Sequence, residues 1–227
     1  MYHNCMPNSR EPHEGGFVPS GVAAQLDEFA AQCISPTMTA AGFRRRRRTY
    51  LLEDDDGSFV VVEFRFSAGD GVTFAIEWAA GPPALRDYFS GNDRKKWPQV
   101  RWGLINTSAR TPPEFRDHPA SNKWWFDPTD SRAYGARFVP YLADVLVPRW
   151  QAALSRDYQR TARTNDPDFS VWNLSAVFGG VDFTEIILNI DTGDPQDLLR
   201  LVERYDSYQP DKDIIMWMRD RIENRPA

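Results

Sequence analysis

The sequence predicts an α+β fold, in which an antiparallel sheet of about five strands packs on an N-terminal helix and is followed by C-terminal helices. Three observations lead to this prediction. Residues 22–41 place apolar side chains at helical spacing and end at a glycine. Residues 43–80 alternate apolar and polar side chains between short polar turns, as an antiparallel meander does. From residue 131 onward the spacing of apolar residues is helical again.

The N-terminal helix is expected over residues 22–41. Gly42 suits the left-handed position that follows a helix end. Pro36 conflicts with a continuous helix, because an interior proline costs about 3 kcal/mol. Either the helix kinks there, or Ser35 caps a second short helix in which Pro36 takes the first position. The expected buried stripe is Val22, Leu26, Phe29, Cys33, Ile34 and Met38. Within it, Cys33 is expected to fill core space rather than to act as a nucleophile.

The first hairpin of the meander is predicted from its register. A three-residue loop at 55–57, with Gly57 left-handed, keeps the apolar residues of both strands on one face. A two-residue turn would send one row to the opposite face. The predicted pairs are Tyr50 with Val62 and Leu52 with Val60.

The rest of the sheet follows from the same alternation. Strands at 59–66 and 72–78 are expected to pair across the loop 67–71. Two further strands are expected near 100–106 and 122–127. The predicted pairs across the second hairpin are Phe64 with Phe74, Val62 with Ile76 and Val60 with Trp78.

A run of five arginines, 44–48, opens the first strand. If the strand is continuous, Arg48 faces Phe64 and Arg46 faces Phe66 on the apolar side of the sheet. One interpretation is a solvated edge strand whose charges prevent edge-to-edge aggregation. The other is a site for an acidic partner or a phosphate group. The first is favoured because charged edges are common.

Four tryptophans form the second candidate surface. Exposed indole rings with polar neighbours could stack on a sugar or a base, but tryptophan is more often buried in the core. In a strand over 123–127, Trp124 and Phe126 point to one side and Trp125 to the other. The set is Trp97, Trp102, Trp124 and Trp125, and the candidate partner surface is Arg46, Arg48, Trp102, Trp124 and Trp125.

Helices are expected in the last part of the chain, with Pro140 and Pro148 as kinks or breaks. Asp182, Asp194 and Asp211 stand where helix caps are expected. Residues 186–190 could form either a helix or a strand, because a short apolar run does not decide. The stripe of the first of these helices is Phe138, Tyr141, Leu142, Val145 and Leu146.

Composition excludes several classes of protein. The net charge of −5 argues against general nucleic-acid binding. With Cys5 and Cys33 as the only cysteines, no disulfide framework or thiolate metal cluster is expected. No apolar run is long enough to span a bilayer, and the N-terminus lacks a signal-peptide core, so a cytoplasmic protein without membrane contact is expected.

No catalytic signature is found in the sequence. His118 is the only histidine outside the polar N-terminal stretch, and its neighbours offer no motif. We therefore assign no catalytic residue, no metal site and no cofactor, and we leave the oligomeric state open. The expected parts are a disordered leader at 1–20, an α+β domain at 21–160 and a helical extension at 167–227.

The order of features resembles a known family. A helix ends in Ala41-Gly42-Phe43 and is followed by the basic run and by two more strands; an Arg-x-Gly-Leu segment at 101–104, Lys123-Trp124-Trp125 and helices come later. In this order the chain resembles the bacterial family catalogued as domain of unknown function 4304, over about residues 24–150. The resemblance implies an α+β fold and no established activity, so it adds no site residue.

Two functions are expected from these observations. The first is a non-catalytic protein-interaction domain, of the type found in immunity proteins or antitoxins. The alternative is a ligand binder or enzyme, with a cleft between the sheet and the C-terminal helices that is lined by tryptophan and arginine. Nucleic-acid binding ranks third.

Overall fold

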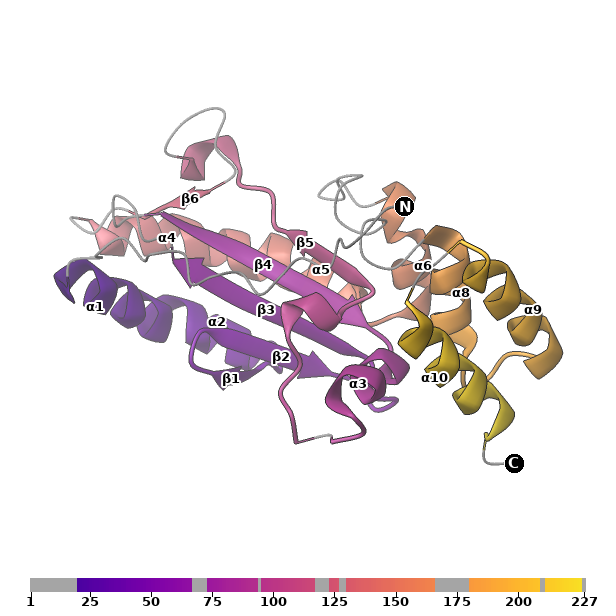
Figure 1. Ribbon diagram of the computed structural model, residues 1–227. Helices are drawn as coiled ribbons and strands as arrows, with labels where there is room; N and C mark the ends of the chain where they lie inside the picture. The colour runs from indigo at the N-terminus through magenta and orange to yellow at the C-terminus, as the bar shows by residue number, and fades with distance from the viewer. Residues whose placement is uncertain are drawn as a thin grey trace, which may run out of the picture.

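The computed structural model describes residues 20–66, 73–93, 95–116, 123–126, 130–165, 180–208 and 211–225. The expected leader, apart from Ser20, lies outside the described residues, and so do the loop 67–71 and His118. Within these ranges, an antiparallel sheet is covered on one face by two long helices, and further helices lie beyond one end of it (Figure 1). The predicted α+β class is confirmed.

The sheet runs in the order β1-β2-β3-β4-β5, and β6 pairs with β4 beside β5. Every neighbouring pair is antiparallel. The strands are β1 (Arg44–Arg46), β2 (Thr49–Glu53), β3 (Phe59–Phe66), β4 (Thr73–Gly81), β5 (Ile105–Ser108) and β6 (Trp124–Trp125).

The predicted register of β2 and β3 is confirmed. Tyr50 pairs with Val62, and Leu52 pairs with Val60. The N–H of Asp54 donates to the Ser58 carbonyl at 3.1 Å and closes the three-residue loop. Gly57 has φ 90°, the left-handed conformation that this loop needs.

The predicted pairing of β3 with β4 is wrong by two residues. Phe64 lies opposite Ile76 rather than Phe74. A shift by two leaves each side chain on the same face of the sheet, so the apolar pattern does not reveal it. The other observed pairs are Val62 with Trp78, Val60 with Ala80 and Phe66 with Phe74.

The sequence predicts one continuous strand through the arginine run and β2, and this prediction is wrong. The run forms its own strand, β1, and the chain reverses at Arg47 and Arg48 so that Arg46 pairs with Thr49. A two-residue turn inverts the parity of the side chains, since residues directly opposite each other share a face. Arg46 therefore lies on the face of Thr49 and not on the face of Tyr50.

The predicted strand near 100–106 begins later than expected. Val100–Trp102 form a turn of 3-10 helix, η2, and the strand that follows is β5. Gly103 lies where an added Cβ would be 2.5 Å from the Ala79 side chain, so this close approach to β4 requires glycine. The predicted strand near 122–127 is present as β6.

The first long helix continues through Pro36. It consists of α1 (Ser20–Phe29), the π-helical turn η1 (Ala30–Ile34) and α2 (Ser35–Ala40). The N–H of Ser35 bonds the Ala30 carbonyl, five residues earlier. The wider π turn relieves the clash that a proline ring makes with the carbonyl four residues before it. Ser35 is therefore not a cap; its hydroxyl lies 2.9 Å from the Tyr50 hydroxyl and joins this helix to β2.

The second long helix repeats this arrangement before Pro148. It consists of α4 (Ser131–Tyr141), the π-helical turn η4 (Leu142–Leu146) and α5 (Val147–Ala152). Asp130 caps it and accepts from the N–H of Ala133 at 3.1 Å. The π turn shifts the phase of the apolar stripe, so Val145 is 45% exposed although the sequence placed it among the buried residues.

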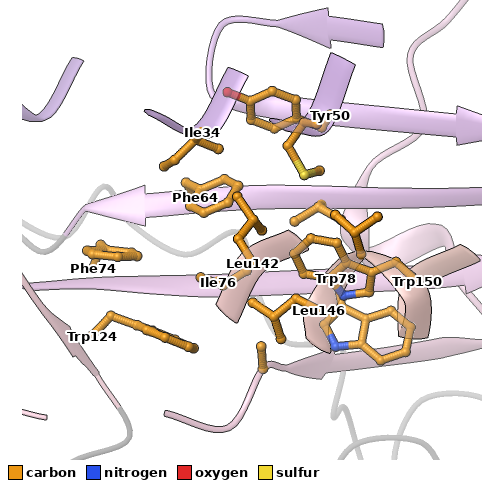
Figure 2. Close-up of a cluster of buried hydrophobic side chains, with 14 of the residues drawn as sticks. Ile34, Tyr50, Phe64, Phe74, Ile76, Trp78, Trp124, Leu142, Leu146 and Trp150 are labelled. Carbon is orange, nitrogen blue, oxygen red and sulfur yellow. The ribbon is translucent and has the colours of Figure 1, made fainter. Parts of the chain in front are cut away.

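The main core lies between the two long helices and the sheet face that carries the even-numbered side chains of β2, β3 and β4 (Figure 2). Its largest members are aromatic, and Trp124 stacks on Phe74 with 6.1 Å between ring centroids. The residues labelled in Figure 2, all buried, are Ile34, Tyr50, Phe64, Phe74, Ile76, Trp78, Trp124, Leu142, Leu146 and Trp150.

The opposite face of the sheet is covered at one end by α3 (Pro83–Ser90) and η2. Phe59, Val61 and Ala79 pack there against Val100 and Trp102. Arg86 of α3 pairs with Glu53 at the end of β2. Farther along, the same face is polar, because Glu63 and Glu77 lie opposite each other with Arg65 beside them.

The C-terminal helices are α6 (Arg156–Asn165), α8 (Gly180–Asn189), α9 (Pro195–Asp206) and α10 (Lys212–Glu223). The last three pack on α3 and on each other, whereas the first lies against α8 and adds Ala162 to the main core. Asp194 and Asp211 cap α9 and α10 as expected. Asp182 lies inside α8 and bonds Arg204 and Tyr208 instead, and residues 186–189 are helical rather than extended. None of the described helices combines the length and the apolar composition that a membrane crossing needs.

Candidate functional site

A pocket of about 630 Å³ opens where the β1–β2 hairpin meets the segment 96–102, on the sheet face away from the two long helices. Its lining combines the arginine turn with two tryptophans. We call it the arginine–tryptophan pocket. Its lining residues are Arg46, Arg47, Thr49, Glu63, Lys96, Trp97, Pro98, Gln99, Val100 and Trp102.

Two arginines at this pocket are unpaired among the residues that the structure describes. Arg44 pairs with Glu53, and Arg48 pairs with Asp27 of α1 at 2.8 Å. The guanidinium groups of Arg46 and Arg47 have no ion pair or hydrogen bond within the described part of the chain. Both side chains are exposed and line the same pocket, so their charges are free to meet an anion.

Arg47 holds an unusual backbone conformation. Its φ is 57°, in the left-handed region that favours glycine, and it is the first residue of a two-residue hairpin turn. A residue with a Cβ is less stable than glycine there by about 1 kcal/mol. Non-glycine residues held in this way concentrate at functional sites.

Two tryptophans, Trp97 and Trp102, form the apolar wall of the pocket. The Arg44 guanidinium lies over the Trp97 ring, 5.7 Å from its centroid, in cation–π geometry. Trp102 stacks on Phe89 with 5.9 Å between centroids and is only 6% exposed. These contacts pack both rings, and the half-buried Trp97 presents apolar surface beside the cations.

One carboxylate also lines the pocket. Burial raises the pKa of Glu63, Arg65 lowers it, and the facing Glu77 raises it further. Lys96 also lines the pocket and donates through Nζ to the Ser90 carbonyl at 2.8 Å. The pocket therefore holds three cationic groups against one carboxyl group that ionises less readily than usual.

The structure brings together two of the five predicted site residues, Arg46 and Trp102. Arg48 lies on the other face of the sheet, paired with α1. Trp124 is fully buried in the core, so it cannot contact a partner, and Trp125 is half-buried on β6.

Arg47 and Lys96 line the pocket although the sequence did not indicate them as site residues, and Trp97 belonged to the tryptophan set but not to the candidate partner surface. Arg47 was passed over because a continuous strand would have turned it away from Arg46. Lys96 and Trp97 stand fifty residues along the chain from the arginine run, and only the fold of α3 and η2 brings them to it. The adjacent Lys-Lys-Trp at 95–97 was the one available signal.

A second pocket, of about 690 Å³, lies between the first and second long helices and is lined in part by Phe29, Cys33 and Val139. Burial raises the pKa of the Cys33 thiol, which makes it a weaker nucleophile. Among the described residues, no cluster of three histidines, cysteines or carboxylates is arranged to hold a metal ion.

The fold and the pocket together define an α+β protein with a cationic, tryptophan-walled pocket beside a sheet edge. Comparison of the chain with models of known protein families, with curated proteins and with solved structures finds no match. The resemblance to the domain of unknown function 4304 stays a prediction.

Proposed function

We propose that this is a non-catalytic binding protein whose arginine–tryptophan pocket receives acidic side chains of a protein partner. One observation carries the proposal: Arg46 and Arg47 line one pocket without a counter-ion in the described chain, and Arg47 holds a backbone conformation that favours glycine. The proposal takes up the interaction domain expected from the sequence and names one surface for it.

The chemistry of the pocket suits carboxylates. A guanidinium group presents a planar fork of donors that matches a carboxylate, and an indole wall beside it excludes water from one side. A single exposed ion pair contributes only about 0–1 kcal/mol. Binding therefore needs several such pairs together with apolar contact on Trp97, which a protein surface can supply.

The positive surface extends beyond the pocket. Lys95 and Arg101 are exposed next to the lining residues Lys96 and Trp102, and neither has an ion pair in the part of the chain that the structure describes. On a chain of net charge −5 this is a localised cationic area. Its extent favours an acidic protein segment over a small anion.

Charge reversal tests the proposal. A fluorescently labelled oligoglutamate peptide is titrated with the full chain, with Arg46→Glu and with Arg137→Glu, and binding is measured by anisotropy. Arg137 is an exposed residue of α4, on the other side of the sheet, and so gives a matched change of charge. We expect affinity to fall about tenfold or more in Arg46→Glu and to stay unchanged in Arg137→Glu.

Equal affinity for the two variants would overturn the proposal. Competition distinguishes the other occupants. If inorganic phosphate displaces the peptide at concentrations too low to act by ionic strength, the pocket is a small-anion site. If oligothymidylate binds more tightly than oligoglutamate, the partner is a nucleic acid.

A further inference from the structure

Strand β1 lies at one edge of the sheet. It is the first strand in the order β1-β2-β3-β4-β5, and within the described ranges no strand pairs with its outer side (Figure 1). All three of its residues are exposed. An edge of this kind can pair with an extended segment of another chain.

The register decides which backbone groups of β1 face outward. Arg46 and Thr49 flank the two-residue turn, so they exchange both of their backbone hydrogen bonds. In an antiparallel ladder, pairs that exchange hydrogen bonds alternate with pairs that do not. The next pair, Arg45 and Tyr50, therefore exchanges no backbone hydrogen bonds. The N–H and C=O of Arg45 therefore point away from β2, toward the open edge.

We propose that an extended acidic segment of a protein partner adds to β1 as a further antiparallel strand, with its backbone paired to Arg45. This rests on the proposed function and names how the partner binds. The partner residue opposite Arg45 shares a face with the Arg45 side chain. Its two neighbours in the segment point to the other face, which is the face of Arg46 and of the pocket.

Charge selects the occupant of this edge. Two copies of this chain paired through β1 would set arginines opposite arginines, which is destabilising. A segment with an acidic residue at every second position has the complementary pattern, because those residues reach Arg46 and Arg47. The same arginines that prevent self-association thus recognise an acidic strand.

Backbone methylation of the ligand tests this inference. The probe is a labelled peptide of about eight residues in which glutamate and threonine alternate. When the glutamate side chains point to the pocket, a threonine stands opposite Arg45. The backbone N–H groups of the threonine residues then point toward β1, and those of the glutamate residues point away from it. Methylation of the threonine amides should lower affinity about tenfold or more, whereas methylation of the glutamate amides should leave it unchanged.

Amide hydrogen exchange supplies a second readout on the full chain. The Arg45 N–H should exchange more slowly when the unmodified peptide is bound, and it should stay unprotected with the peptide methylated on its threonine amides. Suppose that Arg46→Glu weakens binding, but methylation of the threonine amides does not lower the affinity and the bound peptide does not slow exchange of the Arg45 N–H. Strand addition is then overturned, and the proposed function stands. If Arg46→Glu binds the peptide as the unaltered chain does, the proposed function fails and this inference fails with it.

Discussion

Arg221 of α10 and Asp87 of α3 form an ion pair that joins the C-terminal helices to the helix between β4 and β5, with 3.1 Å between Nη2 and Oδ2. The same guanidinium bonds Asp191 at 2.6 Å and 2.9 Å. The Asp87 side chain is only 11% exposed. Arg221 is thus held between two carboxylates, and removal of the better buried one takes away one of its two counter-charges.

Asp87→Ala should therefore lower the free energy of unfolding by about 2 kcal/mol, because a partly buried ion pair loses one partner. Asp197→Ala is the matched control. Asp197 pairs with Arg200 on the exposed surface of α9, where the loss should be under about 0.5 kcal/mol. Denaturant unfolding measures both, and equal losses would show that the Arg221–Asp87 pair does not stabilise the junction.

Tyr134→Phe should raise the free energy of unfolding by about 1 kcal/mol. The Tyr134 side chain is buried, and its hydroxyl has no hydrogen-bond partner among the described residues. Burial also raises the pKa of Tyr134. Removing a buried hydroxyl that makes no bond removes its desolvation penalty.

Tyr50→Phe is the control for that substitution. Tyr50 is equally buried, but its hydroxyl bonds Ser35, so the same change should lower the free energy of unfolding by about 1 kcal/mol. Two losses of similar size, measured by thermal or denaturant unfolding, would mean that Tyr134 has a bonding partner after all.

Stability should depend on pH through the β2–β3 turn. Burial, and then the neighbouring Asp56 carboxyl, raise the pKa of Asp54 from its ordinary value of 3.8 to about 6. The folded chain thus binds this proton more tightly than the unfolded chain does. The stabilisation is complete below about pH 4 and is lost as the pH rises through about 6.

Asp54→Asn should remove that dependence. The asparagine amide cannot ionise, so at about pH 7.5 the variant should have a higher free energy of unfolding than the unaltered chain. The gain should be about 1 kcal/mol, since solvent screens part of the repulsion between Asp54 and Asp56. Near pH 4 the difference should shrink. Unfolding curves recorded across this range test the claim, and a gain that is constant with pH would contradict it.

The sequence predicted the faces of the sheet better than its registers. The Tyr50–Val62 pairing was predicted correctly, because a one-residue slip in that hairpin would have exposed an apolar row. The Phe64–Ile76 pairing was missed, since a two-residue slip exposes nothing. The alternation of apolar and polar residues determines which face each side chain lies on. Only the length of the turn determines which residues pair across the hairpin.

Helix phase and long-range contacts set the other limits. The π turn at η4 exposes Val145, and nothing in the sequence marks such a turn except the proline that follows. Of the candidate site, Arg46 and Trp102 were named, but Arg46 was assigned to the apolar face of the sheet, and it lies on the opposite face, beside Thr49. The reason was that a reversal at two arginines violates the preference for glycine in tight hairpin turns.

Arg47→Gly tests the central claim most directly, because it separates stability from binding. Glycine relieves the left-handed strain of about 1 kcal/mol, although its flexibility in the unfolded chain offsets part of the gain. Arg47→Ala is the matched control, since it loses the same charge and keeps the Cβ.

The measurement is the free energy of unfolding of both variants beside their affinity for the labelled acidic peptide. We predict that both bind at least about fivefold more weakly than the unaltered chain. Arg47→Gly should be as stable as the unaltered chain or more so, and more stable than Arg47→Ala. Unchanged affinity in both variants, or a loss of stability in Arg47→Gly, would contradict the assignment of Arg47 to a binding site.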